Sequence, residues 1–376
     1  MSAVVPDGQL LAGLASPAAE RGPLALEALS LSKDFRLGSH QVVHAVRDVS
    51  FGLYRGAVVS LVGESGSGKS TVAKLLAGQD RPTSGSVRLG GAPVEIASRR
   101  AFRGYKSEVQ LVFQDPFASL NPIHTVRYHL ERPVLLHQHL RTRPEVTRVV
   151  RALLEQVRLT PVDDFIAKYP HELSGGQRQR VSFARALAAR PSVLLADEPV
   201  SMLDVSIRLE MLNLLEQLRR DYQLALLYIT HDIASARYFA DEILVMYAGK
   251  TVERGPAEEL TQQPAHPYTQ LLVASAPDPD DLGSVLRSAA SPTDAAARRV
   301  SSVPESGCPF HPRCPYADER CRAEDPPLLQ ISPRRAAACW NLDVAAPHLA
   351  GGHRPAERPE PGTPRSGSDT RGGSGT

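Results

Sequence analysis

Long hydrophobic runs and an excess of charge of either sign are both missing from this 376-residue chain. No apolar stretch approaches the roughly 18 to 20 residues that a membrane-spanning helix requires. The best runs, 224–229 and 193–196, have the length of strands. The net charge is only +2 and the basic residues are scattered, which argues against a nucleic-acid partner. The sequence therefore predicts a protein that neither spans a bilayer nor binds nucleic acid.

The N-terminal segment also lacks the basic region of a secretory signal, and Pro6, Asp7 and Pro17 interrupt its short apolar stretch. We therefore expect the chain to stay in the cytoplasm. Cysteine is scarce as well, because only four are present and all lie between 308 and 339. A disulfide framework of the kind found in secreted domains is not expected. Residues 1–24 and 345–376 lack sustained periodicity and are predicted to be disordered.

A glycine-rich motif, GESGSGKS, occupies residues 63–70 and matches G-x-x-x-x-G-K-[ST]. It lies between an apolar run suited to a buried strand and a predicted helix over 71–77. In that setting backbone N–H groups surround phosphate oxygens, Lys69 reaches the β- and γ-phosphates, and Ser70 binds Mg²⁺. The residues assigned to nucleotide are Gly63, Glu64, Ser65, Gly66, Ser67, Gly68, Lys69, Ser70 and Thr71. A flexible loop with a chance lysine is the alternative interpretation.

Polar residues end three further predicted strands. Gln114 follows the run 109–113 and is either a turn residue or an amide that bridges a metal and a water. Asp197 and Glu198 end the run 193–196, where Asp197 suits a Mg²⁺ ligand and Glu198 is placed to orient or deprotonate water. A solvated strand end is the alternative for this pair. His231 follows the run 224–230, at the edge of an α/β sheet where ligand groups collect.

A second glycine-bearing stretch, LSGGQ, covers residues 173–177 and opens a predicted helix. Ser174 can cap that helix, while Gly175 and Gly176 leave backbone N–H groups accessible. An exposed helix N-terminus of this kind is a second phosphate site. Because the chain has one P-loop, we expect this site to serve a nucleotide held by another subunit. An ordinary capped helix is the alternative.

These stretches, in this order and together with LLADEP at 194–199, resemble the ATPase subunits of ABC transporters over about residues 25–262. The resemblance implies an α/β P-loop NTPase with a RecA-like core, an antiparallel β subdomain, and a helical subdomain inserted at about 115–190. Two departures are present: Phe35 stands where tyrosine is more usual, and Met202 replaces a usual alanine. Neither departure removes a group that catalysis needs.

The same resemblance implies a role for each matching residue. Glu198 is the general base, and Gln114 contacts Mg²⁺ and the attacking water. His231 contacts the γ-phosphate, and Phe35, otherwise a core or edge aromatic, stacks on adenine. ATP is contacted across a head-to-tail dimer by the signature residues, and Asp204 links the two sites. The signature residues are Ser174, Gly175, Gly176 and Gln177.

The subfamily is indicated by the phrases at 113–122, 169–180 and 264–272, which resemble the dipeptide and oligopeptide importers, a group that includes nickel importers. The resemblance implies a second, related ATPase subunit, two membrane permeases and an extracytoplasmic peptide-binding protein. It places the chain at the cytoplasmic face of the plasma membrane. A soluble ABC ATPase acting on nucleic acid or ribosomes is the competing hypothesis, which the single P-loop and the absence of a heptad run disfavour.

The C-terminal third, 263–344, resembles the extension of peptide-importer ATPases and holds all four cysteines with the spacing C-x5-C-x6-C-x17-C. Four thiolates can hold an iron–sulfur cluster or zinc. The spacing lacks the C-x2-C of common zinc modules, and the resemblance implies a [4Fe–4S] cluster. Zinc and reduced free thiols remain alternatives. The four residues are Cys308, Cys314, Cys321 and Cys339.

Overall fold

The computed structural model describes residues 22–37, 41–95, 98–115, 119–138, 140, 142–276, 304 and 306–349. Its strands are β1 (Leu24–Leu37), β2 (Gln41–Tyr54), β3 (Val58–Val62), β4 (Ser84–Leu89), β5 (Ala92–Pro93), β6 (Val109–Val112), β7 (Val193–Asp197), β8 (Ala225–Thr230), β9 (Glu242–Tyr247), β10 (Lys250–Pro256), β11 (Leu329–Ser332) and β12 (Arg335–Ala337). Its α-helices are α2 (Lys69–Leu76), α3 (Arg99–Glu108), α5 (Val126–His137), α6 (Arg143–Gln156), α7 (Asp163–Ile166), α8 (Gly175–Leu187), α9 (Val205–Tyr222), α10 (Ile233–Phe239), α11 (Ala257–Gln262), α12 (Pro267–Ala274), α15 (Glu319–Ala323) and α16 (Leu342–Ala345), with 3-10 helices η1 (Pro170–Glu172) and η2 (His311–Arg313). None of the helices in these described ranges is long and apolar enough to cross a membrane.

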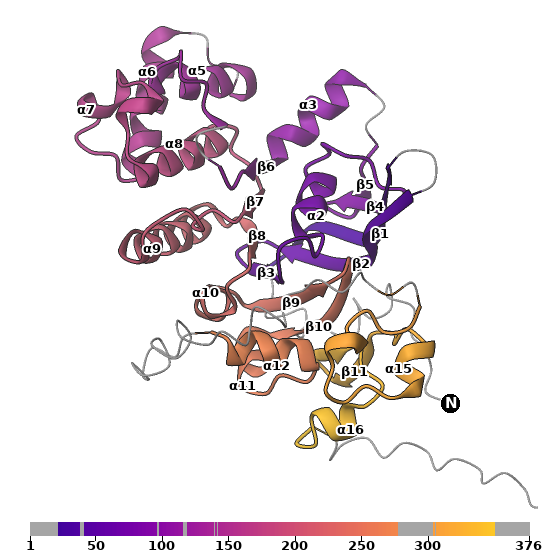
Figure 1. Cartoon of the computed structure of the whole chain (residues 1–376). Helices are drawn as coiled ribbons and strands as arrows, with labels where there is room; N and C mark the ends of the chain where they lie inside the picture. Colours follow the sequence, from indigo (N-terminus) through magenta and orange to yellow (C-terminus); the bar gives the residue numbers. More distant parts are fainter. Residues whose placement is uncertain are drawn as a thin grey trace, which may run out of the picture.

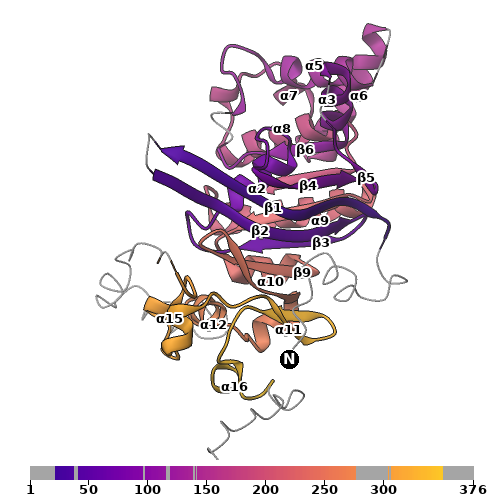
Figure 2. The same cartoon turned by 90° about the vertical axis from the view of Figure 1, so that its right-hand side faces the viewer.

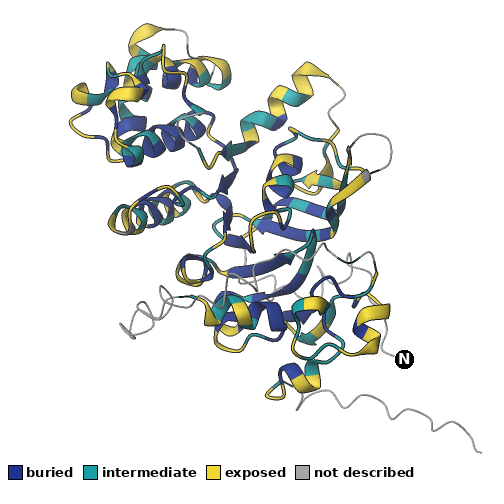
Figure 3. Cartoon of the chain, in the orientation of Figure 1, coloured by how far each residue is buried: buried dark blue, intermediate teal, exposed yellow. Residues whose placement is uncertain are grey.

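The centre of the molecule is an eight-stranded sheet with the order β11-β12-β10-β9-β3-β8-β7-β6. The strands from β9 to β6 run parallel to one another, and every residue of β3, β7 and β8 is buried. Such continuous apolar strands are expected where helices cover both faces of a parallel sheet. Figure 3 shows the central strands buried beneath the helices. Because the strands are parallel, the residues that follow β3, β6, β7 and β8 meet at one edge.

A second, antiparallel sheet has the order β2-β1-β4-β5 and packs over α2 (Figure 2). The apolar runs 42–46 and 49–53, with polar residues between them, locally predict two strands separated by a turn. That prediction is wrong, because both runs belong to the single strand β2. The chain passes through Asp48 at φ 51° as an irregularity in the ladder, and the Asp48 N–H donates to Ser32 Oγ at 3.0 Å. A polar pair in mid-strand therefore looked like a turn. The predicted α/β fold with an antiparallel β subdomain is confirmed.

Helices α5, α6, α7 and α8 form a group that lies apart from the β1–β2 sheet (Figure 1). Apolar side chains at helical spacing hold it together, and Thr142 opens α6 with a reciprocal capping box to Glu145. Buried members include Leu130, Val134, Val150, Leu154 and Val181. The group therefore has an apolar interior that is continuous with one face of the central sheet.

The C-terminal residues 304 and 306–349, hereafter the cysteine lobe, pack against α12 and the β9–β10 edge (Figure 1). Strand β12 pairs antiparallel with β10, so the lobe extends the central sheet. A buried ion pair secures this junction, with Arg335 Nη2 3.0 Å from Glu253 Oε1. Of the segments predicted to be disordered, only 22–24 and 345–349 lie within the described residues.

Candidate nucleotide site

The loop between β3 and α2 is built by glycines that larger residues cannot replace. Gly68 adopts φ +101°, and a Cβ there would lie 2.3 Å from the Ala45 carbonyl oxygen. Gly66 adopts φ +83° and faces open space. The Ser67 N–H donates to the Glu64 carbonyl at 3.2 Å, which closes the loop on itself. Positive φ without a Cβ penalty is what lets successive N–H groups face one concave side.

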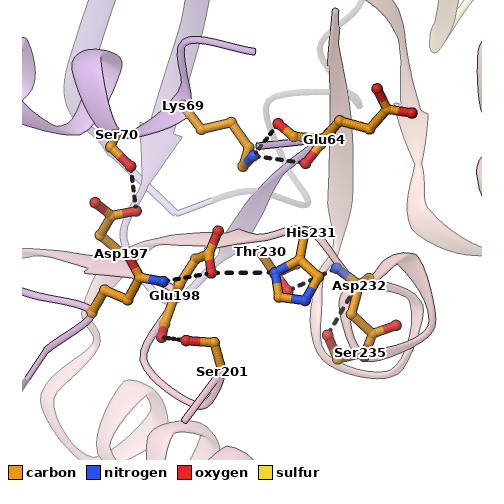
Figure 4. Close-up of polar contacts among 12 residues, drawn as sticks. Glu64, Lys69, Ser70, Asp197, Glu198, Ser201, Thr230, His231, Asp232 and Ser235 are labelled. Carbon is orange, nitrogen blue, oxygen red and sulfur yellow. Dashed lines mark hydrogen bonds and ion pairs between the residues drawn. The ribbon is translucent and has the colours of Figure 1, made fainter. Parts of the chain in front are cut away.

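Lys69 is buried at the first position of α2, and its amine lies inside this loop (Figure 4). Its Nζ donates to the Gly63 carbonyl at 2.6 Å and to the Glu64 carbonyl at 2.8 Å. Burial lowers the pKa of Lys69, while the carboxylates of Glu198 and Asp197 act in the opposite direction. The structure thus places a cation where phosphate oxygens enter the loop.

Ser70 and Asp197 meet across α2 and the end of β7, with Ser70 Oγ donating to Asp197 Oδ1 at 3.2 Å (Figure 4). Burial raises the pKa of Asp197, and the adjacent Glu198 carboxylate adds to that rise. A hydroxyl beside a partly desolvated carboxylate is a donor set that suits Mg²⁺, which prefers hard oxygen ligands. The residues present therefore fit the metal ion that the sequence predicts here.

Glu198 is the point at which three strand ends converge. Gln114 Nε2 donates to Glu198 Oε2 at 3.0 Å, and His231 Nδ1 lies 3.2 Å from the same oxygen. The backbone of Glu198 has φ 45°, a conformation that non-glycine residues rarely adopt, and its N–H donates to the Ile229 carbonyl. The Glu198 side chain lines the same cleft as the loop, and its carboxylate acts on Lys69. No local sequence pattern indicates this backbone conformation.

Gln114, Glu198 and His231 line a cleft of about 1260 Å³ together with the P-loop. Val43, His44 and Ala45 of β2 form another side of it. Phe35 pairs in register with Val43 and is 37% exposed, but it is not among the residues that line the cleft. Residues of the P-loop and of the three strand ends line this cleft together. They are Glu64, Ser65, Gly66, Gly68, Lys69, Ser70, Thr71, Gln114, Glu198 and His231.

The signature stretch lies at the start of α8 in the helical group, and none of its residues lines this cleft. Ser174 Oγ accepts from the Gln177 N–H at 3.3 Å, and Gln177 Oε1 accepts from the Ser174 N–H at 3.0 Å. Gly175 is therefore the first residue of α8. A Cβ built on Gly175 would lie 3.7 Å from Leu203 Cδ2. Asp204, the residue after Leu203, is exposed. The signature residues and Asp204 therefore lie outside the cleft.

The four cysteines line one small cavity of about 10 Å³ together with His266 and His311. All four are free thiols. Burial raises the pKa of Cys308 to about 11 and that of Cys339 to about 12. Within the part of the chain that the structure describes, no group of three histidine, cysteine or acidic side chains is arranged to hold a metal ion. Thiolate sulfur is a ligand that soft metals prefer. In this structure, however, the four cysteines are protonated thiols, and the cavity between them has room for about one water molecule.

Two contacts to the loop were missed from the sequence. Arg313 of the cysteine lobe forms a bidentate ion pair with Glu64, and the Tyr268 hydroxyl accepts from the Glu64 N–H. Both partners lie more than 200 positions along the chain from Glu64. No local pattern indicates such pairs, because periodicity reports only on neighbouring residues.

Comparison with known proteins identifies both parts of the chain. The ABC transporter family matches residues 46–201, and the oligopeptide/dipeptide transporter C-terminal region matches residues 252–321. The di/tripeptide transport ATP-binding protein DppF of Pseudomonas aeruginosa is 42% identical over 305 residues, which cover 79% of this chain and 90% of that protein. The oligopeptide transport ATP-binding protein AppF of Bacillus subtilis is 41% identical over 298 residues, covering 79% and 89%.

Solved structures agree with this assignment. The ATP-binding cassette MJ0796, in a dimeric post-hydrolysis state bound to ADP and Pi, superimposes with a TM-score of 0.56 at 28% identity, covering 62% of this chain and 98% of that one. CbiO1 of Clostridium perfringens, part of the transporter complex cbiONQ, gives 0.57 at 26% identity, covering 64% and 92%. The chain belongs to the ABC transporter family, in its oligopeptide/dipeptide branch of ATP-binding subunits.

Proposed function

We propose that this chain is the ATP-hydrolysing, energy-coupling subunit of an importer for dipeptides or oligopeptides. The observation that carries the proposal is the convergence of Gln114 and His231 on the Glu198 carboxylate beside a P-loop, in a chain whose relatives are peptide-transport ATP-binding proteins. ATP is bound and hydrolysed here, and the conformational change is passed to separate membrane subunits.

Each group in the cleft has a part in phosphoryl transfer. The loop N–H groups and Lys69 bind the β- and γ-phosphates, and Phe35 stacks on adenine. Ser70, Gln114 and Asp197 would hold Mg²⁺, which would neutralise charge on the phosphate oxygens when bound. Glu198 accepts the proton of the attacking water, and His231 donates a hydrogen bond to the γ-phosphate. Positioning and charge stabilisation supply most of the catalysis.

The ATP site is completed by a second ATPase subunit, related but not identical to this one. Signature residues 174–177 contact the nucleotide of that partner, and Asp204 links the two sites. The geometry supports this arrangement, because the signature and Asp204 lie outside this chain's own cleft. An isolated chain is then expected to bind ATP but to hydrolyse it poorly.

Ser174→Phe is expected to impair the partner's ATP site more than this chain's own. The bulky ring would block the helix N-terminus that faces the partner's phosphates. The assembled transporter is labelled with a photoreactive ATP analogue that is trapped in the site by vanadate. The two ATPase subunits are then separated by size or tag, and the label in each is measured. Thr142→Phe is the matched control, because Thr142 caps α6 with the same kind of capping box. Equal loss of label in both subunits would contradict the cross-dimer site.

The other partners are two membrane permeases and an extracytoplasmic peptide-binding protein, which hold the chain at the cytoplasmic face of the plasma membrane. Docking uses the helical group and the loop 115–122, of which 116–118 lie outside the described residues. Exposed apolar side chains on this group support the proposal, and the described ones include Ile123, Tyr128, Leu135 and Leu136. We also propose that the chain divides into an N-terminal segment 1–24, an ATPase domain 25–262, a C-terminal extension 263–344 and a tail 345–376.

Deleting the gene is expected to abolish uptake of labelled di- and tripeptides while leaving nickel uptake unchanged. The reason is that relatives at 41–42% identity are named for peptide transport. Uptake is measured in whole cells. A plasmid copy of the wild-type gene is expected to restore peptide uptake, and a Lys69→Ala copy is not. Loss of nickel uptake with normal peptide uptake would assign the chain to the nickel importers of the same family.

For the cysteine cavity we propose a [4Fe–4S] cluster held by all four thiolates. The support is that the four side chains line a single cavity, although the cavity must widen and the thiols must ionise to accept a cluster. Protein purified without oxygen is expected to be brown, with about four iron and four sulfide per chain. One zinc per chain, or metal-free protein with four titratable thiols, would contradict the cluster in favour of the alternative found.

A further inference from the structure

The cysteine lobe contacts the phosphate-binding loop directly at Glu64. Arg313 Nη1 lies 2.9 Å from Glu64 Oε2, and Nη2 lies 2.9 Å from Oε1, so the pair is bidentate. The hydroxyl of Tyr268 accepts the Glu64 N–H at 2.8 Å. Both the side chain and the backbone of one P-loop residue are therefore fixed by the C-terminal part of the chain.

The two side chains that hold Glu64 are themselves supported by packed rings. Tyr268 is fully buried, and its ring centroid lies 4.7 Å from that of Tyr247 and 5.5 Å from that of Phe310. The Arg313 guanidinium lies over the same two rings, 5.9 Å from Tyr247 and 5.5 Å from Phe310. Cation–π contacts with two rings, together with the bidentate pair, restrict the orientation of the guanidinium.

Glu64 in turn controls the inside of the loop. Its carbonyl oxygen accepts from Lys69 Nζ at 2.8 Å and from the Ser67 N–H at 3.2 Å. A rotation of the peptide units at Glu64 would move the acceptor of the lysine and reorient an N–H group next to the phosphate positions. Arg313 therefore acts through Glu64 on groups that line the cleft, although Arg313 itself is not among the lining residues.

We propose that Arg313 is a positioning residue for the P-loop, through which the conformation of the cysteine lobe sets the affinity for ATP. Arg313 ends the 3-10 helix η2, and Cys308 and Cys314 bracket that helix. A change at the cysteines is thus transmitted to Glu64 over a few residues of chain. The inference rests on the nucleotide site proposed above.

An exposed ion pair often contributes nothing measurable, so the geometry must distinguish this one. Here the pair is bidentate, the arginine side chain is 27% exposed, and the partner lies in a loop that binds ligand. A comparable pair, Arg151 with Asp163, lies on the surface of the helical group, far from the cleft. It serves as a matched control for loss of a bidentate pair.

The test is a double-mutant cycle on binding of Mg·ATP to the full chain, measured by calorimetry. Arg313→Ala and Glu64→Gln are each expected to weaken binding about five-fold, a size typical of a well-placed pair, and the double variant no further. Arg313→Lys is expected to recover only part, because an ammonium cannot form the bidentate contact. Arg151→Ala is expected to bind as the wild type does.

A second readout separates positioning from simple structural loss. By reciprocity, ATP must stabilise the lobe if the lobe stabilises the ATP-binding loop. ATP is therefore expected to slow hydrogen exchange of the backbone segment 308–314, followed by mass spectrometry, in the wild type but not in Arg313→Ala or Glu64→Gln. Glu64→Gln leaves the lobe sequence intact, so it answers the question even if Arg313→Ala is unstable.

The outcomes are distinct. Wild-type protein that does not bind ATP would overturn the nucleotide site itself. Wild-type binding with unchanged affinity in Arg313→Ala and Glu64→Gln would overturn only the positioning role. Strictly additive losses in the double variant, or an effect of ATP on hydrogen exchange of 308–314 that survives both substitutions, would do the same.

Discussion

Glu198→Gln is expected to lower ATP turnover by about a hundredfold or more while leaving ATP affinity within about two-fold. The substitution keeps the shape of the side chain but removes the carboxylate that, in the proposed mechanism, accepts a proton from water. Affinity is expected to be preserved because the proposed phosphate contacts are to the loop and Lys69, which the substitution does not change. Turnover is measured on the assembled transporter, and affinity on the isolated chain by calorimetry.

The surroundings of Glu198 make this substitution informative. Its Oε2 is shared by Gln114 and His231, and an amide oxygen can still accept from one of them. The strained backbone at φ 45° is also retained, so the site should keep its shape. Glu155→Gln on the exposed face of α6 is the control for a generic loss of charge. Hydrolysis near the wild-type rate in Glu198→Gln would remove this residue from the role of base.

Arg335→Met is expected to destabilise the junction between the cysteine lobe and the core by about 3–5 kcal/mol, because it leaves a buried carboxylate without its counterion. Glu253 is fully buried, and Arg335 is 3% exposed. Burial raises the pKa of Glu253, while the groups that favour its charged form include the N–H groups of His266 and Ala265 and the Arg335 guanidinium.

Hydrogen exchange of β10 and β12, followed by mass spectrometry, reports on this junction without requiring two-state unfolding. Arg334→Met is the matched control, since the neighbouring arginine is exposed. Adding Glu253→Gln to Arg335→Met is expected to recover part of the loss, because the buried charge is removed while an acceptor remains. Exchange in Arg335→Met equal to that in Arg334→Met would show that the pair contributes little.

The sequence predicts the parallel core well because its strands are continuous apolar runs that end in recognisable motifs. The run before the P-loop, the run before Asp197 and the run before His231 all became adjacent buried strands. Parallel strands bring their ends to one edge, and the structure places Gln114 and His231 within hydrogen-bond distance of the same oxygen of Glu198.

Features that depend on distant residues were not predictable in this way. The irregularity at Asp48, which made one strand look like two, is held by Ser32 on the neighbouring strand. The positive φ of Glu198 and the ion pair of Arg313 with Glu64 leave no trace in local composition. Likewise, short strands β11 and β12 carry too few residues for periodicity to identify them.

The pairing of β12 with β10 also bears on how such proteins can be recombined. Because the lobe supplies a strand to the shared sheet, exchanging it between relatives would transplant half of a hydrogen-bonded ladder together with half of the Glu253–Arg335 pair. A hybrid that inherits the acid without the matching base would carry an uncompensated charge at its seam. The C-terminal part and the core are therefore expected to be inherited as a unit, with crossover points tolerated only where they keep both partners.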